Sequence, residues 1–360
     1  MKPTRRKTKV VDIGGVSLGG ENPVRVQSMT TTDPSDLDVT LPQIKALEDA
    51  GCEMIRTSVL NQKQGEALGE LKKHMNTPLI ADIHYHWKLA FTAIEQGVDK
   101  IRINPGNIGH DDRFKEIVRA AKANDVPMRI GVNSGSLEAA ILEKYSYPTP
   151  EGFVESALRY IDMADELGYD KIVISLKSSD IHTAIAAYRL FSQKSNFPLH
   201  LGITEAGDPN YGAIKSAAGM SPLLLDGIGD TIRVSLTGDP ALEIPVAYDI
   251  LKTTGVRVLS PEIVSCPTCG RIQIEMEPIV EELNKRLSHV NEPLRVSVLG
   301  CIVNGPGEAR ESDIGLAGGN GQGVIYRKGE LVRKVKEEEM IDAVMEEVDA
   351  FLKDRKKSGK

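Results

Sequence analysis

The chain has 360 residues, of which 41% are hydrophobic and 26% charged, and a formal net charge of −7. This length exceeds that of one ordinary domain. The proportion of hydrophobic to charged residues is typical of a folded rather than a disordered protein. No apolar run of about 18 residues occurs, and no apolar stretch follows the basic N-terminus, so the sequence predicts neither a transmembrane helix nor a secretory signal. We therefore expect a cytoplasmic protein. The negative charge argues against nucleic acid or a membrane surface as its partner.

The first two thirds of the chain alternate short β-branched runs with longer amphipathic stretches, which indicates parallel strands joined by helices. About eight such units in roughly 230 residues fit a (β/α)8 TIM barrel better than an open doubly wound sheet. The predicted strands are Val24–Ser28, Met54–Ser58, Leu79–His84, Lys100–Asn104, Pro127–Asn133, Lys171–Lys177, Leu199–Glu205 and Thr231–Thr237. The predicted helices include Leu41–Ala50, Trp87–Gln96, Asp112–Ala123, Gly152–Leu167, Ile181–Ser192 and Ala241–Lys252.

The pattern changes near residue 255, so we expect a barrel domain over 1–255 and a small α/β domain over 256–360. In the second domain we expect strands at Val256–Leu259, Leu294–Leu299, Asp313–Leu316 and Val324–Arg327, and helices at Ile272–Ser288 and Glu337–Leu352. The glycine-rich segment 315–323 lacks the Lys-Ser/Thr pair of a phosphate loop. It is better interpreted as a turn between two strands.

The carboxyl ends of barrel strands supply the active site in this fold. Here they carry cations on five different strands, and the acids Asp82 and Glu205 lie at the same ends. Any one arginine has about even odds of pairing with an internal carboxylate, but the acids at this rim are too few for all five cations. We therefore expect a small substrate with more than one phosphate. The cations are Arg56, Arg102, Arg129, Lys177 and Arg233, accompanied by Asn133 and Ser235.

Cysteines are rare and clustered. Cys266 and Cys269 form a Cys-x-x-Cys pair, and Cys301 follows a predicted strand in a glycine-rich turn. Such spacing is typical of a metal or iron–sulfur centre. Three cysteines are one ligand short of a closed site, and Glu308 is the nearest other candidate. We interpret Cys52 as a buried apolar residue, and His84 and His86 as polar loop residues rather than metal ligands.

The cysteines allow three other interpretations. A structural zinc site would normally be closed by a fourth Cys or a His, and no His follows Cys301. A redox-active dithiol would need only Cys266 and Cys269 and would leave Cys301 without a role. Plain core packing without any metal is the third interpretation.

Several motifs resemble those of the 4-hydroxy-3-methylbut-2-enyl diphosphate synthase family over essentially the whole chain. The most specific are Ser265-Cys-Pro-Thr-Cys-Gly-Arg271 and Gly300-Cys-Ile-Val-Asn-Gly-Pro-Gly-Glu308. The others are Val26-Gln-Ser-Met-Thr30, Ala81-Asp-Ile-His-Tyr85, Arg102-Ile-Asn-Pro-Gly106, Arg129-Ile-Gly-Val-Asn-Ser-Gly-Ser136 and Gly202-Ile-Thr-Glu-Ala-Gly207. The resemblance implies a TIM barrel followed by a small domain that holds a [4Fe–4S] cluster, in the short bacterial form.

The resemblance also implies roles for individual residues. Cys266, Cys269, Cys301 and Glu308 match the cluster ligands of the family. Arg56, Arg102, Arg129, Asn133, Lys177, Arg233 and Ser235 fall where the family binds the cyclic diphosphate, and Glu205 matches its barrel acid. Asp82 is kept with Glu205 and Glu308 as a candidate catalytic residue.

The implied reaction is the reductive ring opening of 2-C-methyl-D-erythritol 2,4-cyclodiphosphate, with two electrons added and water lost, in the methylerythritol phosphate pathway. Because the sequence shows no flavin or nicotinamide site, a reduced flavodoxin or ferredoxin is expected as donor. The resemblance further implies a homodimer. Two other classes remain open: a barrel transferase or lyase with a structural metal knuckle, and a non-enzymatic redox-sensing module.

Overall fold

The computed structural model describes residues 3–84 and 86–357. Its contacts divide the chain into two compact units, Met1–Arg257 and Val258–Lys360. The division falls two residues beyond the boundary expected from the sequence. Each unit has its own hydrophobic core and is described by itself below.

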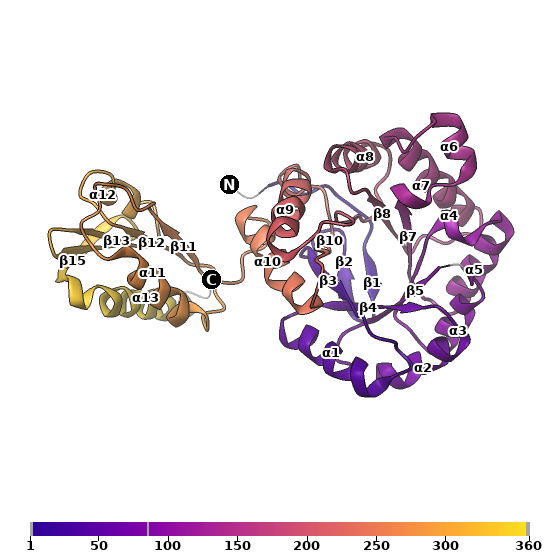
Figure 1. Ribbon diagram of the computed structural model, residues 1–360, viewed down its shortest axis with the longest axis horizontal. Helices are drawn as coiled ribbons and strands as arrows, with labels where there is room; N and C mark the ends of the chain where they lie inside the picture. The colour runs from indigo at the N-terminus through magenta and orange to yellow at the C-terminus, as the bar shows by residue number, and fades with distance from the viewer. Residues whose placement is uncertain (1–2, 85, 358–360) are drawn as a thin grey trace. The chain divides into compact units, whose positions relative to one another are not determined.

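The first unit is the expected TIM barrel (Figure 1). Every neighbouring pair in the strand order β8-β7-β6-β5-β4-β3-β10-β9 is parallel. A parallel bridge between Ile174 and Leu199 joins the two ends of this order and closes the ring. The strands are β3 (Arg25–Met29), β4 (Met54–Val59), β5 (Leu79–Ile83), β6 (Lys100–Ile103), β7 (Met128–Asn133), β8 (Ile172–Lys177), β9 (His200–Leu201) and β10 (Thr231–Ile232).

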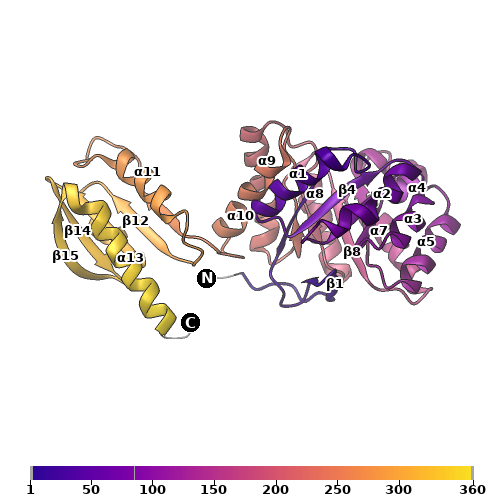
Figure 2. The same cartoon turned by 90° about the horizontal axis from the view of Figure 1, so that it is seen from below.

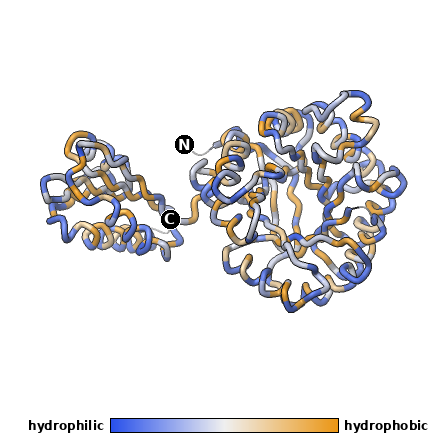
Figure 3. The backbone as a smooth tube through the Cα atoms, in the orientation of Figure 1, coloured by the Kyte–Doolittle hydropathy of each residue, from blue (hydrophilic) through white to orange (hydrophobic). Residues whose placement is uncertain are grey.

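Helices surround the barrel because each carries an apolar stripe. In α5, the buried residues Phe114, Ile117, Val118 and Ala121 recur at helical spacing, and the alternation of orange and blue along the outer helices is visible in Figure 3. The strands are covered on both faces, and β5 and β8 are buried along their whole length. The helices are α1 (Leu37–Asp49), α2 (Gln62–Lys73), α3 (Leu89–Glu95), α4 (Pro105–Ile108), α5 (Asp111–Ala123), α6 (Ala139–Tyr145), α7 (Pro150–Asp165), α8 (Ile181–Lys194), α9 (Pro209–Leu225) and α10 (Glu243–Thr253).

An N-terminal hairpin closes one end of the barrel. Strands β1 (Val11–Ile13) and β2 (Val16–Leu18) pair antiparallel (Figure 2). Their buried side chains Val11, Ile13 and Leu18 form a cluster with residues near the starts of the barrel strands, Met54, Ile80 and Val173. The hairpin therefore seals the amino-terminal end of the strands and leaves the carboxyl end as the mouth.

The second unit is a five-stranded mixed sheet in the order β11-β12-β13-β14-β15. Strands β11 (Glu262–Ser265), β12 (Arg295–Leu299) and β13 (Ile314–Gly319) are parallel, whereas β14 (Gln322–Arg327) and β15 (Glu330–Lys336) continue antiparallel. The long helices α11 (Met276–Leu287) and α13 (Met340–Lys357) bury Leu283 and Val344 in its core. A short helix, α12 (Gly305–Ala309), follows β12.

Several element boundaries differ from the sequence prediction. Barrel strands seven and eight are two residues long, and the residues expected to extend them form loops at the mouth. The strand expected at Val256–Leu259 is wrong. There, the Val256 and Arg257 amides both donate to Leu251 and finish α10, while Arg257 pairs with Glu53 at 2.6 Å. The hairpin β1–β2 and the strand β15 were not expected.

The interpretation of segment 315–323 as a turn is confirmed. Strands β13 and β14 pair up to Gly319 and Gln322, leaving only Asn320 and Gly321 between them. Both have positive φ, 51° and 70°, as a two-residue hairpin turn requires. Gly321 therefore serves a tight connection, whereas the other glycines of this segment lie within β13 and β14.

Candidate functional site

Five ionic side chains share the inward face of the barrel at its mouth. Strand alternation places Arg56, Asp82, Arg102, Arg129 and Lys177 on this face, and the register pairs Asp82 with Arg102 and Arg102 with Arg129 across adjacent strands. All five are at most 7% exposed. The structure thus brings together the cations that the sequence analysis singled out.

Asp82 lies between two of these arginines. Its Oδ1 accepts from Arg102 Nη1 at 2.9 Å, and its Oδ2 lies 3.4 Å from Arg56 Nε. His84 Nε2 lies 3.5 Å from the same carboxylate, which agrees with a polar loop role for that histidine. Burial raises the pKa of Asp82, but the two arginines outweigh it and hold that pKa well below its usual range. Asp82 is therefore ionised at neutral pH and positions two guanidinium groups.

The arginine on the eighth strand has a carboxylate partner that the sequence analysis missed. Arg233 Nη2 lies 3.2 Å from Glu243 Oε1, and Ser28 Oγ donates to Glu243 Oε2 at 2.7 Å. Glu243 opens helix α10 and is 2% exposed. The only sequence feature that could have indicated this buried role is an acidic residue beside the apolar face of a helix. Carboxylates therefore pair with Arg56, Arg102 and Arg233, but among the described residues none pairs with Arg129 or Lys177, so the acids remain too few for all five cations.

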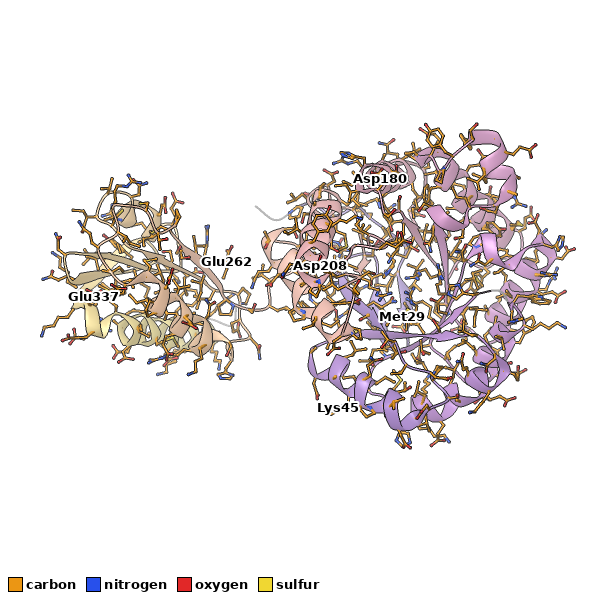
Figure 4. The ribbon with its side chains drawn as sticks, in the orientation of Figure 1. Met29, Lys45, Asp180, Asp208, Glu262 and Glu337 are labelled. Atoms are coloured by element: carbon orange, nitrogen blue, oxygen red, sulfur yellow. The ribbon has the colours of Figure 1, made fainter. Side chains whose placement is uncertain are left out.

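Met29 lies between two of the guanidinium groups. Its sulfur is 3.1 Å from Arg56 Nη2 and 3.6 Å from Arg233 Nη1. Figure 4 shows Met29 within the ring of strands, whereas Lys45 lies on the outer helix α1. A thioether is only a weak acceptor. Met29 therefore separates the two guanidinium groups without neutralising them.

Arg129 and Lys177 are the cations of this group that no described carboxylate contacts. Arg129 Nε and Nη1 are buried without a hydrogen-bond partner in the described structure. Burial lowers the pKa of Lys177 well below its usual value, and the neighbouring arginines lower it further. A Cβ on Gly202 would lie 2.5 Å from Lys177 Nζ, so only glycine fits beside this ammonium group. An anionic ligand would offset both charges.

Of the two neutral candidates, Asn133 contacts this group directly. Asn133, with its amide oxygen turned toward the guanidinium, accepts from Arg102 Nη2 at 3.2 Å. Ser235 is half-buried in the loop after β10. Both can donate to a ligand held by the cations.

Glu205 differs from its expected place. It lies four residues beyond the end of β9 rather than within that strand, and its side chain is exposed. Its φ is +54°, an uncommon value for a residue with a Cβ. Lys215 Nζ donates to its carbonyl oxygen at 3.2 Å. The Glu205 carboxylate is therefore free of an ion pair among the described residues.

In the second unit, parallel pairing brings Cys266 and Cys301 to the same edge of the sheet. Ser265 is in register with Val298, so Cys266 follows β11 and Cys301 follows β12 at neighbouring strand ends. The Gly300 amide donates to Cys266 Sγ at 3.4 Å. Backbone amides of Asn304 and Val303 lower the pKa of Cys301, and the Arg271 amide and side chain lower that of Cys269.

The ligands expected from the sequence are not gathered into a coordination shell. Within residues 3–84 and 86–357, no group of three Cys, His, Asp or Glu side chains is close enough to hold a metal ion. Glu308 is exposed on α12. The donor set nevertheless fits a thiophilic centre, because two of the three thiols at this edge have lowered pKa values.

Cys52 has no part in this group. It is 3% exposed within the barrel core, and burial raises its pKa to about 12. Its interpretation as a small apolar residue is confirmed. Among the described helices, none combines the length and apolarity that a membrane span requires.

Comparison with known proteins decides the family. A model described as the GcpE TIM-barrel domain matches residues 8–248, and one described as the GcpE protein C-terminal domain matches residues 262–350. The chain belongs to the GcpE family. The resemblance inferred from the motifs is thereby confirmed, as is the TIM-barrel fold.

GcpE relatives match the chain over nearly its whole length. A 4-hydroxy-3-methylbut-2-en-1-yl diphosphate synthase (flavodoxin) from Geobacter sulfurreducens is 52% identical over 351 residues, covering 98% of this chain and 99% of the relative. The protein of the same name from Caldanaerobacter subterraneus subsp. tengcongensis is 51% identical over 350 residues, with 97% and 99% covered.

Two solved structures are similar to about two thirds of this chain. A type I 3-dehydroquinate dehydratase from Clostridium difficile superposes with a TM-score of 0.51 at 16% identity and covers 68% of this chain and 97% of that one. A dihydropteroate synthase from Yersinia pestis superposes with a TM-score of 0.50 at 14% identity and covers 69% of this chain and 100% of that one. At such identities the likeness shows the fold and nothing of the chemistry.

Proposed function

We propose that this GcpE chain is an oxidoreductase that opens the ring of 2-C-methyl-D-erythritol 2,4-cyclodiphosphate and removes water, giving 4-hydroxy-3-methylbut-2-enyl diphosphate for isoprenoid synthesis. The observation that carries the proposal is the set of buried cations at the barrel mouth. It fits a ligand with two phosphates, and the relatives are named for a diphosphate product. Those names fit this reaction and not the transferase or lyase considered from the sequence.

The barrel cations divide into two groups by their contacts. Arg129 and Lys177 have no described carboxylate partner and would contribute charge directly to the phosphates. Arg56, Arg102 and Arg233 are already oriented by Asp82 and Glu243 and would donate N–H groups in fixed directions. Asn133 and Ser235 would add neutral hydrogen bonds.

Asp82 and Glu205 then have different roles. Asp82 was a catalytic candidate, but its two oxygens are committed to arginines and its low pKa leaves it no proton to donate. We assign it to positioning. Glu205 is exposed at the mouth and without an ion pair among the described residues, so it is available to hold a substrate hydroxyl or to transfer a proton.

Cys266, Cys269, Cys301 and Glu308 would hold a [4Fe–4S] cluster. When bound, the cluster supplies the two electrons of the reaction one at a time. The strand-end cysteines and the amides that lower the pKa of Cys301 favour the thiolate form that iron requires. Glu308 would be the exchangeable ligand, since a carboxylate binds iron less firmly than a thiolate.

The electron donor is proposed to be a reduced flavodoxin, the protein given in the names of the relatives, with ferredoxin as the other candidate. We also propose that the chain works as a homodimer in the cytoplasm.

The proposal is tested on anaerobically purified full-length protein. We expect four irons and four acid-labile sulfides per chain, and turnover of the cyclodiphosphate with reduced flavodoxin or with an artificial reductant. The EPR spectrum of the reduced protein should change when the cyclodiphosphate is added. Protein that contains iron and sulfide but neither binds nor reduces the cyclodiphosphate would contradict the reaction. Zinc in place of iron would support a structural knuckle.

A further inference from the structure

A second layer of polar side chains lies inside the barrel below the mouth. Each member is a strand residue that stands two positions before a residue of the mouth, which lies on the same strand or directly after its end. Lys100 precedes Arg102, Ser175 precedes Lys177, and Thr231 precedes Arg233. Gln27 and His200 have the same relation to Met29 and Gly202. The exposed fractions of these five side chains, Gln27, Lys100, Ser175, His200 and Thr231, are at most 1%.

The polar atoms of this layer have no partner among the described residues. Lys100 Nζ, both ring nitrogens of His200 and the hydroxyls of Ser175 and Thr231 are buried and unpaired. The amide of Gln27 is unpaired as well, as are Arg129 Nε and Nη1 at the neighbouring level. Buried polar groups are almost always paired in folded proteins. These groups therefore need partners from outside the chain, either a bound ion or ordered water.

The charges that act on this layer are all positive. Burial lowers the pKa of Lys100, and Arg129 and Arg56 lower it further. Burial likewise lowers the pKa of His200, and the positive charges of Lys177, Arg129 and Lys100 lower it further. The nearby carboxylates are already engaged higher up, Asp82 by Arg56 and Arg102 and Glu243 by Arg233. The unpaired groups are mostly donors, so the ligand must accept hydrogen bonds and carry negative charge.

The layer is closed off from solvent below by the hairpin. Val11, Ile13 and Leu18 pack on Met54, Ile80 and Val173, and Ile80 is in register with Lys100. The barrel interior at this level receives side chains from β3, β6, β8, β9 and β10. Donors that converge from separate strands suit a spherical acceptor, which has no preferred direction.

We propose that the barrel binds a small monovalent inorganic anion, a halide in its simplest form, between Lys100, Arg129 and His200, with the hydroxyls of Ser175 and Thr231 as further donors. The anion is separate from the substrate and lies one layer beneath it. It offsets the charges of Lys100 and Arg129, and so keeps Arg129 cationic and fixed for the phosphates above. This site does not depend on the reaction proposed above.

The test uses bromide as the probe on the full-length, anaerobically purified protein. Crystals grown in sodium bromide should show an anomalous bromine peak between Lys100 and His200, and pyrophosphate should not displace it. In solution, the melting temperature should rise with bromide at constant ionic strength set with gluconate. A peak beside Lys177 alone, displaced by pyrophosphate, would place the anion in the diphosphate site and overturn the proposal.

Two variants and one control complete the test. Lys100→Met should abolish the bromide-dependent rise in melting temperature. Ser175→Ala is a milder change and should weaken the bromide affinity about tenfold, because it removes one hydrogen bond to a charged group. Lys63→Met removes an exposed lysine of α2 and should leave the rise unchanged. No interior bromine peak, or an undiminished rise in both Lys100→Met and Ser175→Ala, would show that water alone fills the layer.

Discussion

Asp82 accepts a hydrogen bond from Arg102 at 2.9 Å inside the barrel, and neither residue is more than 4% exposed. The same carboxylate lies 3.4 Å from Arg56. One anion thus orients two of the cations that we assign to the diphosphate. Removing a partner from a buried pair leaves an uncompensated charge, which is far more costly than losing a surface pair.

Asp82→Asn should therefore destabilise the barrel by about 3–5 kcal/mol. Urea unfolding at neutral pH measures the change. The control is Asp170→Asn, which removes the 64%-exposed partner of Lys9 and should cost no more than about 1 kcal/mol. Equal, small effects of the two changes would show that the buried arginines do not need Asp82.

The pH dependence of the stability of Asp82→Asn follows from the direction in which folding shifts the pKa of Asp82. The pKa of Asp82 is lower in the folded protein than in the unfolded chain, so its stabilising contribution is present above the unfolded value near 4. It is lost as the pH falls through the lower folded value. We expect Asp82→Asn to lose less stability than the parent protein between about pH 4 and pH 2, measured by urea unfolding. Parallel curves would contradict a lowered pKa.

Lys177→Ala should weaken binding of the cyclodiphosphate by about 1.5–3 kcal/mol, because the ammonium group has no described carboxylate partner to occupy it. Calorimetric titration with the substrate measures this. Iron content should not change. Lys171→Ala is the matched control, since that lysine pairs with exposed Asp125 away from the mouth. Unchanged affinity in Lys177→Ala would remove this residue from the anion site.

Glu205→Gln should lower turnover much more than substrate affinity. The amide keeps the size of the side chain and its ability to accept one hydrogen bond, but it cannot transfer a proton. Single-turnover rates with an artificial reductant, compared with the dissociation constant, separate the two effects. Turnover near that of the parent protein would leave Glu205 as a surface group without a catalytic role.

Glu308→Cys should still assemble the cluster yet react poorly, because a fourth thiolate would not give way to a substrate oxygen. Cys301→Ser should instead lose iron, since it removes one of the thiolates at the sheet edge. Iron content, EPR and turnover on anaerobically purified variants measure both. Full turnover in Glu308→Cys with an intact cluster would show that an exchangeable carboxylate is not needed.

Much of this architecture could be predicted because local patterns determine it. The first six barrel strands are mostly buried, and α5 has a clear apolar stripe, so both were found close to their observed bounds. The cations at the mouth followed from their place at strand ends. The wrong predictions concern residues whose partners are far away in sequence. Glu243 meets Ser28 across 215 residues, and no local pattern encodes that contact.

The short strands seven and eight were overpredicted for a related reason. Their β-branched residues continue past Leu201 and Ile232, but the backbone there turns to form the mouth instead of pairing. The buried layer at Lys100 and His200 was also not anticipated. A lysine inside a parallel strand contradicts the apolar pattern, and only the closed ring reveals that both residues point inward together.

The pairing of β10 with β3 has a consequence for synthesis on the ribosome. Thr231 and Arg25 are in register, so the first barrel strand to be made has an unpaired edge until more than two hundred further residues have been translated. Exposed strand edges are sites of aggregation. The nascent chain therefore passes through a long interval in which six strands can form an open, curved sheet with an unpaired edge strand that is prone to aggregation. The nascent chain should need chaperones most in that interval and less once the eighth strand has left the exit tunnel.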